Sequence, residues 1–189
     1  MTFCTVNAKI KAMRGNSLSL EDNVARLLHY IHERPLKNFI KSMADGLIIG
    51  KTDIQYYLSL WQNLGVLDKL SQKAMRRVIG MEIDLRNILW IYRLKRYYGV
   101  VGDATFGYLI PVGNKIPREM ISRMAAYKDI AGLIAEVAQG PYDGVFGDFN
   151  HGEQKLAAAV QKQYQREIRK NPNSIATVCG YLYEKSLKK

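Results

Sequence analysis

Cysteine, histidine and long apolar runs are all scarce in this sequence of 189 residues. Its two cysteines, Cys4 and Cys179, stand near opposite ends without metal-type spacing, which argues against a disulfide framework or a zinc site and favours a reducing compartment. His29 and His32 have helical ligand spacing but no third ligand, so we expect no metal and no cofactor. Charged residues break every apolar run before it reaches the roughly 20 residues that span a bilayer, and no signal peptide is evident.

Positive charge, by contrast, is in excess. The chain has 28 Lys and Arg against 17 Asp and Glu, a formal net charge of +11. Such a charge favours an acidic partner, which could be nucleic acid, an anionic membrane surface or an acidic protein, and charge alone does not choose among them. The hydrophobic content of 48% is enough to bury a core in one domain or two small ones.

The stretch from Ala74 to Gly99 contains no proline and predicts one long helix around which the rest of the chain is arranged. At about 100° per residue, Glu82, Arg86 and Arg93 fall on one narrow stripe, and apolar side chains cover most of the remaining circumference. A helix with this pattern is mostly buried. Glu82 and Arg86, at positions i and i+4, are expected to form a solvated pair on its exposed stripe.

Asp84 and Asn87 lie one turn apart and roughly opposite that stripe, so both are predicted to point into apolar surroundings. Two interpretations compete. A general-base role for Asp84 needs a second titratable group, and no His, Cys or second carboxylate lies on that face. We therefore favour a packing role, in which the two side chains satisfy backbone groups of a neighbouring helix or loop and set the packing register.

The same 3.6-residue spacing recurs along the chain and predicts an all-α fold built of helical bundle units. Ser19 is expected to cap a helix that Pro35 interrupts, and Ser174 to cap the last helix. The other expected helices cover residues 3–15, 36–43, 53–65, 128–139, 153–170 and 175–189, and one more opens at Pro117. Residues 140–152 are rich in glycine and predict a loop, which Tyr142, Phe146 and Phe149 are expected to pack down.

The segment GLIIGKT, residues 46–52, resembles a phosphate-binding loop but does not match its pattern. A Walker A loop has four residues between its first glycine and the Gly-Lys-Thr, whereas this segment has three. Ile48 and Ile49 also suit a tight loop poorly, and no strand precedes it. We therefore expect a turn between two helices here, with no ATP binding.

Three segments, taken in order, carry a resemblance to a known family. The first is NAKIKAMRG at residues 7–15, followed by Leu18, Ser19, Glu21 and Asp22. The second is EIDLRNILWIYRLKRYY at residues 82–98, which holds Glu82, Asp84, Asn87 and Arg93. The third is RKNPNSIA at residues 169–176 with GYLYEK at 180–185. In this order they are similar to the C subunit of the A/V-type rotary ATPases, whose counterpart in the vacuolar enzymes is the d subunit.

The resemblance implies an arrangement of the whole chain, because members of the family have three related helical units around a funnel. Residues 1–189 would form a single all-helical region of this type, with approximate repeat heads near residues 7–30 and 114–138. LSLEDNVARLL at 18–28 indeed resembles IPREMISRMAA at 116–126. Compared with the family, an internal piece is expected to be absent near residues 31–53, and the C-terminal end is expected to be short.

The resemblance also implies a function without catalysis. In the family this subunit seats the central stalk of D and F subunits and rests on the membrane rotor ring, in a complex that moves protons or sodium ions. We therefore expect a peripheral protein at the cytoplasmic face of a membrane, with no nucleic-acid partner and no small-molecule substrate. The alternative is a basic helical nucleic-acid-binding protein, although the basic residues are spread along the chain and no reading motif is present. A helical hydrolase would need a nucleophile beside a base, and none is in view.

Overall fold

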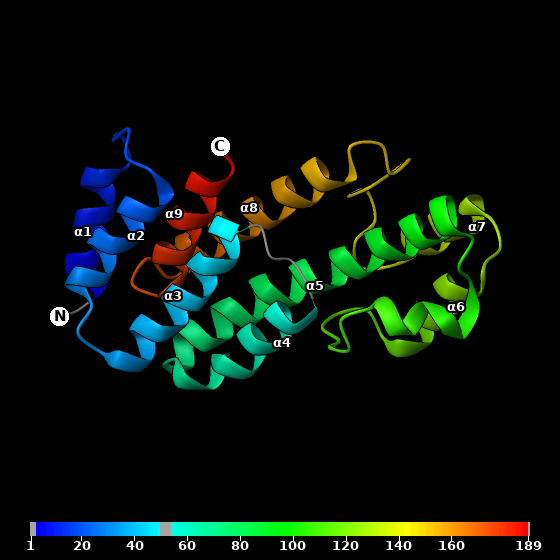
Figure 1. Ribbon diagram of the computed structural model, residues 1–189, viewed down its shortest axis with the longest axis horizontal. Helices are drawn as coiled ribbons and strands as arrows, with labels where there is room; N and C mark the ends of the chain where they lie inside the picture. The colour runs from blue at the N-terminus through cyan, green and yellow to red at the C-terminus, as the bar shows by residue number, and fades with distance from the viewer. Residues whose placement is uncertain (1–2, 50–53, 189) are drawn as a thin grey trace. The chain divides into compact units, whose positions relative to one another are not determined.

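The computed structural model describes residues 3–49 and 54–188, and within them every regular element is helical. The predicted all-α class is confirmed. The α-helices are α1 (Phe3–Met13), α2 (Leu20–Tyr30), α3 (Arg34–Ile49), α4 (Ile54–Asn63), α5 (Lys69–Tyr98), α6 (Arg118–Ala126), α7 (Ile130–Ala138), α8 (Gly152–Lys170) and α9 (Ala176–Ser186) (Figure 1). Two short 3₁₀ helices, η1 (Leu64–Val66) and η2 (Gly102–Tyr108), complete the set.

The chain divides into two compact units. The first comprises Met1–Val78 and Gln161–Lys189, and the second comprises Ile79–Val160. Both boundaries fall inside helices, since α5 and α8 each contribute residues to both units. The predicted internal repeat stays a prediction.

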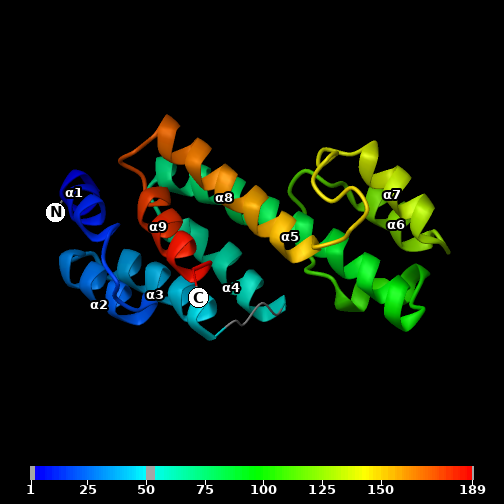
Figure 2. The same cartoon turned by 90° about the horizontal axis from the view of Figure 1, so that it is seen from above.

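In the first unit, α9 packs against α1, α2 and α3, an arrangement that can be followed in Figure 2. Helices α2 and α3 are amphipathic and turn their apolar faces to a shared core. Its largest fully buried side chains include Tyr57, Tyr181, Phe39, Leu27 and Ile40. Seven of the eleven residues of α9 are buried, which is why its sequence carries little polar face.

The start of α2 agrees with prediction, because the Ser19 hydroxyl accepts a hydrogen bond from the backbone N–H of Asp22 at 3.0 Å. The predicted helix at residues 36–43 is too short. Helix α3 already begins at Arg34, and Pro35 lies in its first turn, where the missing N–H would have no helical partner anyway. The helix then continues to Ile49.

The predicted turn at residues 46–52 is therefore wrong for its first part, since residues 46–49 are helical and residues 50–53 lie outside the described ranges. Gly46 lies within this last part of the helix and has a packing role. A Cβ at Gly46 would stand 2.1 Å from the ring of Tyr56, whose hydroxyl donates to the carbonyl of Met43 at 3.2 Å. This glycine serves close packing of α4 on α3 and does not form a phosphate loop.

The second unit contains the later part of α5, with η2, α6, α7, the loop before α8 and the first turns of α8. That loop is packed down by its aromatics, as predicted. Tyr142, Phe146 and Phe149 are all buried, and the Phe149 ring stacks on Tyr92 of α5 with centroids 4.5 Å apart. Phe149 adopts a left-handed backbone, φ 62°, which this stacking helps to hold.

Candidate functional site

Asp84 lies on the buried face of α5 and holds the segment that precedes α6. Only 1% of the residue is exposed. Its Oδ2 accepts hydrogen bonds from the backbone N–H of Lys115 at 2.8 Å and from the hydroxyl of Tyr142 at 2.7 Å. Its Oδ1 accepts a longer one, 3.3 Å, from the N–H of Asn114. The carboxylate thus binds both the loop before α6 and Tyr142 to α5.

Asn87, almost one turn further along α5, clamps a single residue from both sides. Its amide nitrogen donates to the carbonyl of Ile110 at 3.0 Å, and its amide oxygen accepts from the N–H of the same residue at 2.9 Å. Asn87 is 1% exposed. Asp84 and Asn87 therefore bind backbone groups of a neighbouring loop, as the helical projection predicts.

Gly80 belongs to the same face, although the sequence-based predictions do not include it. A Cβ at this position would stand 2.6 Å from Cγ of Asn114. The loop can approach α5 this closely only because the helix has no side chain there. An isolated glycine inside a long helix is itself a sequence signal for close packing, so this residue could have been found.

Burial and hydrogen bonding act in opposite directions on this cluster. Burial raises the pKa of Asp84, while the bonds from Lys115, Tyr142 and Asn114 oppose the shift. Burial and the Asp84 charge together raise the pKa of Tyr142, so its hydroxyl stays protonated and donates. The amide of Asn114 donates to that hydroxyl in turn, at 3.3 Å. These bonds suit a structural cluster that holds a loop in place.

The stripe of Glu82, Arg86 and Arg93 differs from its prediction in one respect. Arg86 donates to Glu82 at 3.1 Å, but both side chains are only 12% exposed, so the pair is not solvated. Glu153 in the first turn of α8 extends this ion pair. This carboxylate lies 2.9 Å from Arg93 and 3.8 Å from Arg86, and the four residues form one chain of ion pairs.

Lys95 is a further buried polar residue of α5, and the sequence pattern does not single it out. Its Nζ donates to the carbonyls of Ala125 at 2.6 Å and Tyr127 at 2.5 Å, at the C-terminal end of α6. Burial lowers the pKa of Lys95, and the charge of Asp129 partly compensates. A cation at this helix end satisfies carbonyls that have no partner within the helix.

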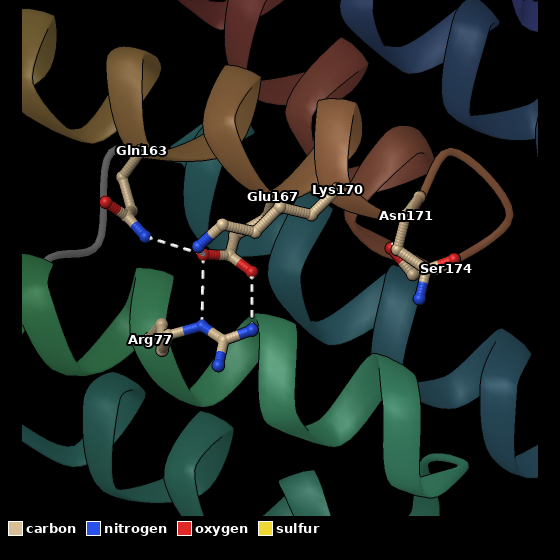
Figure 3. A network of polar contacts seen from close by, with 6 residues as sticks. All are labelled: Arg77, Gln163, Glu167, Lys170, Asn171 and Ser174. Atoms are coloured by element: carbon tan, nitrogen blue, oxygen red, sulfur yellow. Dashed lines mark hydrogen bonds and ion pairs between the residues drawn. The ribbon is translucent and has the colours of Figure 1, made fainter.

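The first unit has its own polar cluster, drawn in Figure 3. Glu167 of α8 is 1% exposed. Its carboxylate accepts hydrogen bonds from Nε and Nη2 of Arg77 on α5, at 3.0 and 2.8 Å. Gln163 donates to the same carboxylate at 2.8 Å, and Lys170 lies 3.7 Å away. This bidentate pair joins α5 to α8 within the unit.

The turn that follows α8 corrects one predicted cap. Ser174 does not cap the last helix, because α9 has Ile175 at its N-cap position and no side-chain cap. The Ser174 hydroxyl donates instead to the carbonyl of Asn171 at 2.9 Å (Figure 3). The N–H of Ile175 donates to the hydroxyl of the buried Ser71 at 3.0 Å. A residue of α5 thus supplies the acceptor that a capping side chain would otherwise provide.

Two of the three segments that carry the resemblance meet in the first unit. The hydroxyl of Tyr181 donates to Oδ1 of Asn23 at 2.7 Å and to the carbonyl of Met13 at 3.2 Å. Lys185 donates to the carbonyl of Asn16 at 2.8 Å and to its side chain at 3.1 Å. Residues 13–23 and 181–185 are thus held together by specific bonds, although they lie at opposite ends of the chain.

Other kinds of site find little support in the described chain. Within residues 3–49 and 54–188, no group of three or more His, Cys, Asp or Glu is placed to hold a metal ion. Over the same ranges, no helix combines the length and apolarity needed to cross a bilayer. One pocket of about 270 Å³ opens between η2 and α6 in the second unit, and apart from Arg118 its walls carry no ionisable side chain.

The comparisons with known proteins add one match. The model of the family described as ATP synthase (C/AC39) subunit matches residues 6–187. No curated protein matches the sequence.

Proposed function

The chain belongs to the ATP synthase (C/AC39) subunit family, and we propose that it acts as a non-catalytic coupling subunit of an A/V-type rotary ATPase. In this role it links the central stalk of D and F subunits to the membrane rotor ring. The observation that carries the proposal is the extent of the match, which covers all but the first five and last two of the 189 residues.

The use of the polar residues supports a role without chemistry. Asp84 and Asn87 are the most buried polar residues of the α5 segment that resembles the family. Their hydrogen bonds are made to backbone groups and to the hydroxyl of Tyr142. A general base would need a lone pair free to take a proton from a substrate. We infer that these residues give the second unit a defined, rigid loop arrangement, which a part that transmits torque requires.

The charge supports the choice of partners. An excess of eleven positive charges favours association with acidic proteins or with the anionic cytoplasmic leaflet of a membrane. We therefore propose that the chain works at the cytoplasmic face, as a peripheral subunit in proton or sodium-ion transport. Nucleic acid would satisfy the same charge, so the test includes it.

Co-purification is the most direct test. The tagged chain is co-expressed with the D and F subunits and the rotor ring, and the lysate is divided into two halves, one treated with nuclease before capture and one left untreated. We expect the stalk subunits and the ring to be recovered with the chain at moderate salt. Recovery of nucleic acid alone, with an affinity that falls steeply as salt rises, would replace the proposal by the nucleic-acid-binding alternative.

A further inference from the structure

The pocket between η2 and α6 is concave, largely apolar and confined to the second unit. Its volume is about 270 Å³. Apolar side chains form most of its walls, among them Phe106, Leu109, Ile110, Ile116 and Ile121. Ligand pockets in proteins typically hold about 300–1,000 Å³, so this one suits a ligand below the usual size.

The polar residues of α5 hold the walls of this pocket in place. Asn87 clamps Ile110, which lines the pocket, through both its N–H and its carbonyl. Asp84 holds the N–H of Lys115, next to the lining residue Ile116. Since both ends of this wall are bonded to one helix, the pocket is formed before any ligand arrives, which lowers the ordering cost of binding.

A single cation stands at the pocket. Arg118, in the first turn of α6, is the one lining residue with a charge, and its guanidinium lies 5.7 Å from the centroid of the Phe106 ring. Among the residues that the structure describes, no carboxylate forms an ion pair with Arg118. An apolar pocket with an exposed guanidinium beside it is complementary to a molecule with an apolar tail and an anionic head.

We propose that this pocket binds a medium-chain monocarboxylate, with the alkyl tail between η2 and α6 and the carboxylate on Arg118. The proposal is independent of the coupling function, because it concerns a ligand of the isolated chain. An acidic peptide with one apolar side chain could offer similar groups, and it serves as a competing outcome in the test.

The first measurement is a calorimetric titration of the full chain with hexanoate, octanoate and decanoate below their micelle concentrations. Each added methylene should tighten binding about fourfold until the pocket is filled, since burial of one CH₂ contributes about 0.8 kcal/mol. Decanol, which has the tail without the charge, should bind more weakly than decanoate. Equal affinity for all three acids would overturn the proposal.

Two matched variants test the contribution of the cation. Arg118→Gln should remove the preference for decanoate over decanol and leave the chain-length dependence intact. Arg166→Gln removes one exposed positive charge from the first unit and should leave binding unchanged. An equal loss in both variants would show attraction by net charge alone and would exclude a site at Arg118.

Methyl NMR with labelled isoleucine locates the ligand without any variant. The methyl resonances of the lining residues Ile110, Ile116 and Ile121 should shift on addition of decanoate, whereas those of Ile10 and Ile40 in the first unit should not. Shifts confined to the first unit would refute the site. Binding of a short Glu/Leu peptide to these isoleucines, with no effect of decanoate, would replace the carboxylate by a protein partner.

Discussion

Replacement of Asp84 separates a structural carboxylate from a chemical one. Asp84→Ala leaves the hydroxyl of the buried Tyr142 and the N–H of Lys115 without their acceptor, and also removes the longer bond from Asn114. Each stranded group costs about 1–3 kcal/mol. We expect a total loss of about 3 kcal/mol in the free energy of unfolding, or about 6–12 °C in Tm for a chain of this size.

Asp84→Asn is expected to cost much less, about 1 kcal/mol, because it keeps the shape and one acceptor oxygen. Its cost should also depend on pH. Burial raises the pKa of Asp84 in the folded state, so the stability that this carboxyl contributes is fully present below its unfolded value near 3.8 and is lost as pH rises through the folded pKa. The cost of Asp84→Asn should therefore be largest below pH 3.8 and shrink as the pH rises.

Urea melts in a Trp61→Phe background measure these costs, since Trp90 of α5 then reports alone from the second unit. Asp143→Ala, at an exposed position of the same unit, is the matched control and should stay within about 0.5 kcal/mol of the parent. A neutral Asp84→Ala would refute the burial of this side chain. A variant Asp84→Asn that folds like the parent but abolishes coupling in an assembled complex would refute the structural role.

Two other predictions concern the same unit. Gly80→Ala should lower the free energy of unfolding in urea melts by a net amount of about 1 kcal/mol, since the clash with Asn114 outweighs the gain in helix propensity. The control Gly65→Ala, whose added Cβ would have no atom within 4 Å, should be neutral or stabilising. The hydrogen bond from Lys155, together with two from Asn150, lowers the pKa of Asp148 to about 2, so the stability that this carboxylate contributes is present above pH 3.8 and lost as pH falls through about 2. Lys155→Met should return the Asp148 pKa towards 3.8 in an NMR titration, and an unchanged value would contradict this contact.

Much of the central helix could be predicted because helical periodicity is a local property. Residues three and four apart share a face whatever the rest of the chain does, so the side on which Asp84 and Asn87 lie follows from the sequence. Their need for hydrogen-bond partners follows as well, because a buried polar group without one is costly. The cap at Ser19 was predictable for the same reason, since its partner is three residues away.

The identity of distant partners could not be predicted in this way. Tyr142 reaches Asp84 across 58 positions, and Glu153 forms an ion pair with Arg86 of the Glu82–Arg86 pair that periodicity alone placed in solvent. The cap predicted at Ser174 was wrong for the same reason. The N–H of Ile175 donates to the hydroxyl of Ser71, which lies on α5 and is distant in the sequence.

The sequence by itself determined the helical class, the buried face of α5 and the segments that resemble the family, since each depends on residues close together in the chain. Only the tertiary structure decided which loop Asp84 and Asn87 hold, that Gly80 admits Asn114, and that a pocket with Arg118 at its wall lies between η2 and α6. Such contacts depend on where the folded chain brings remote residues together, and local spacing carries no information about that.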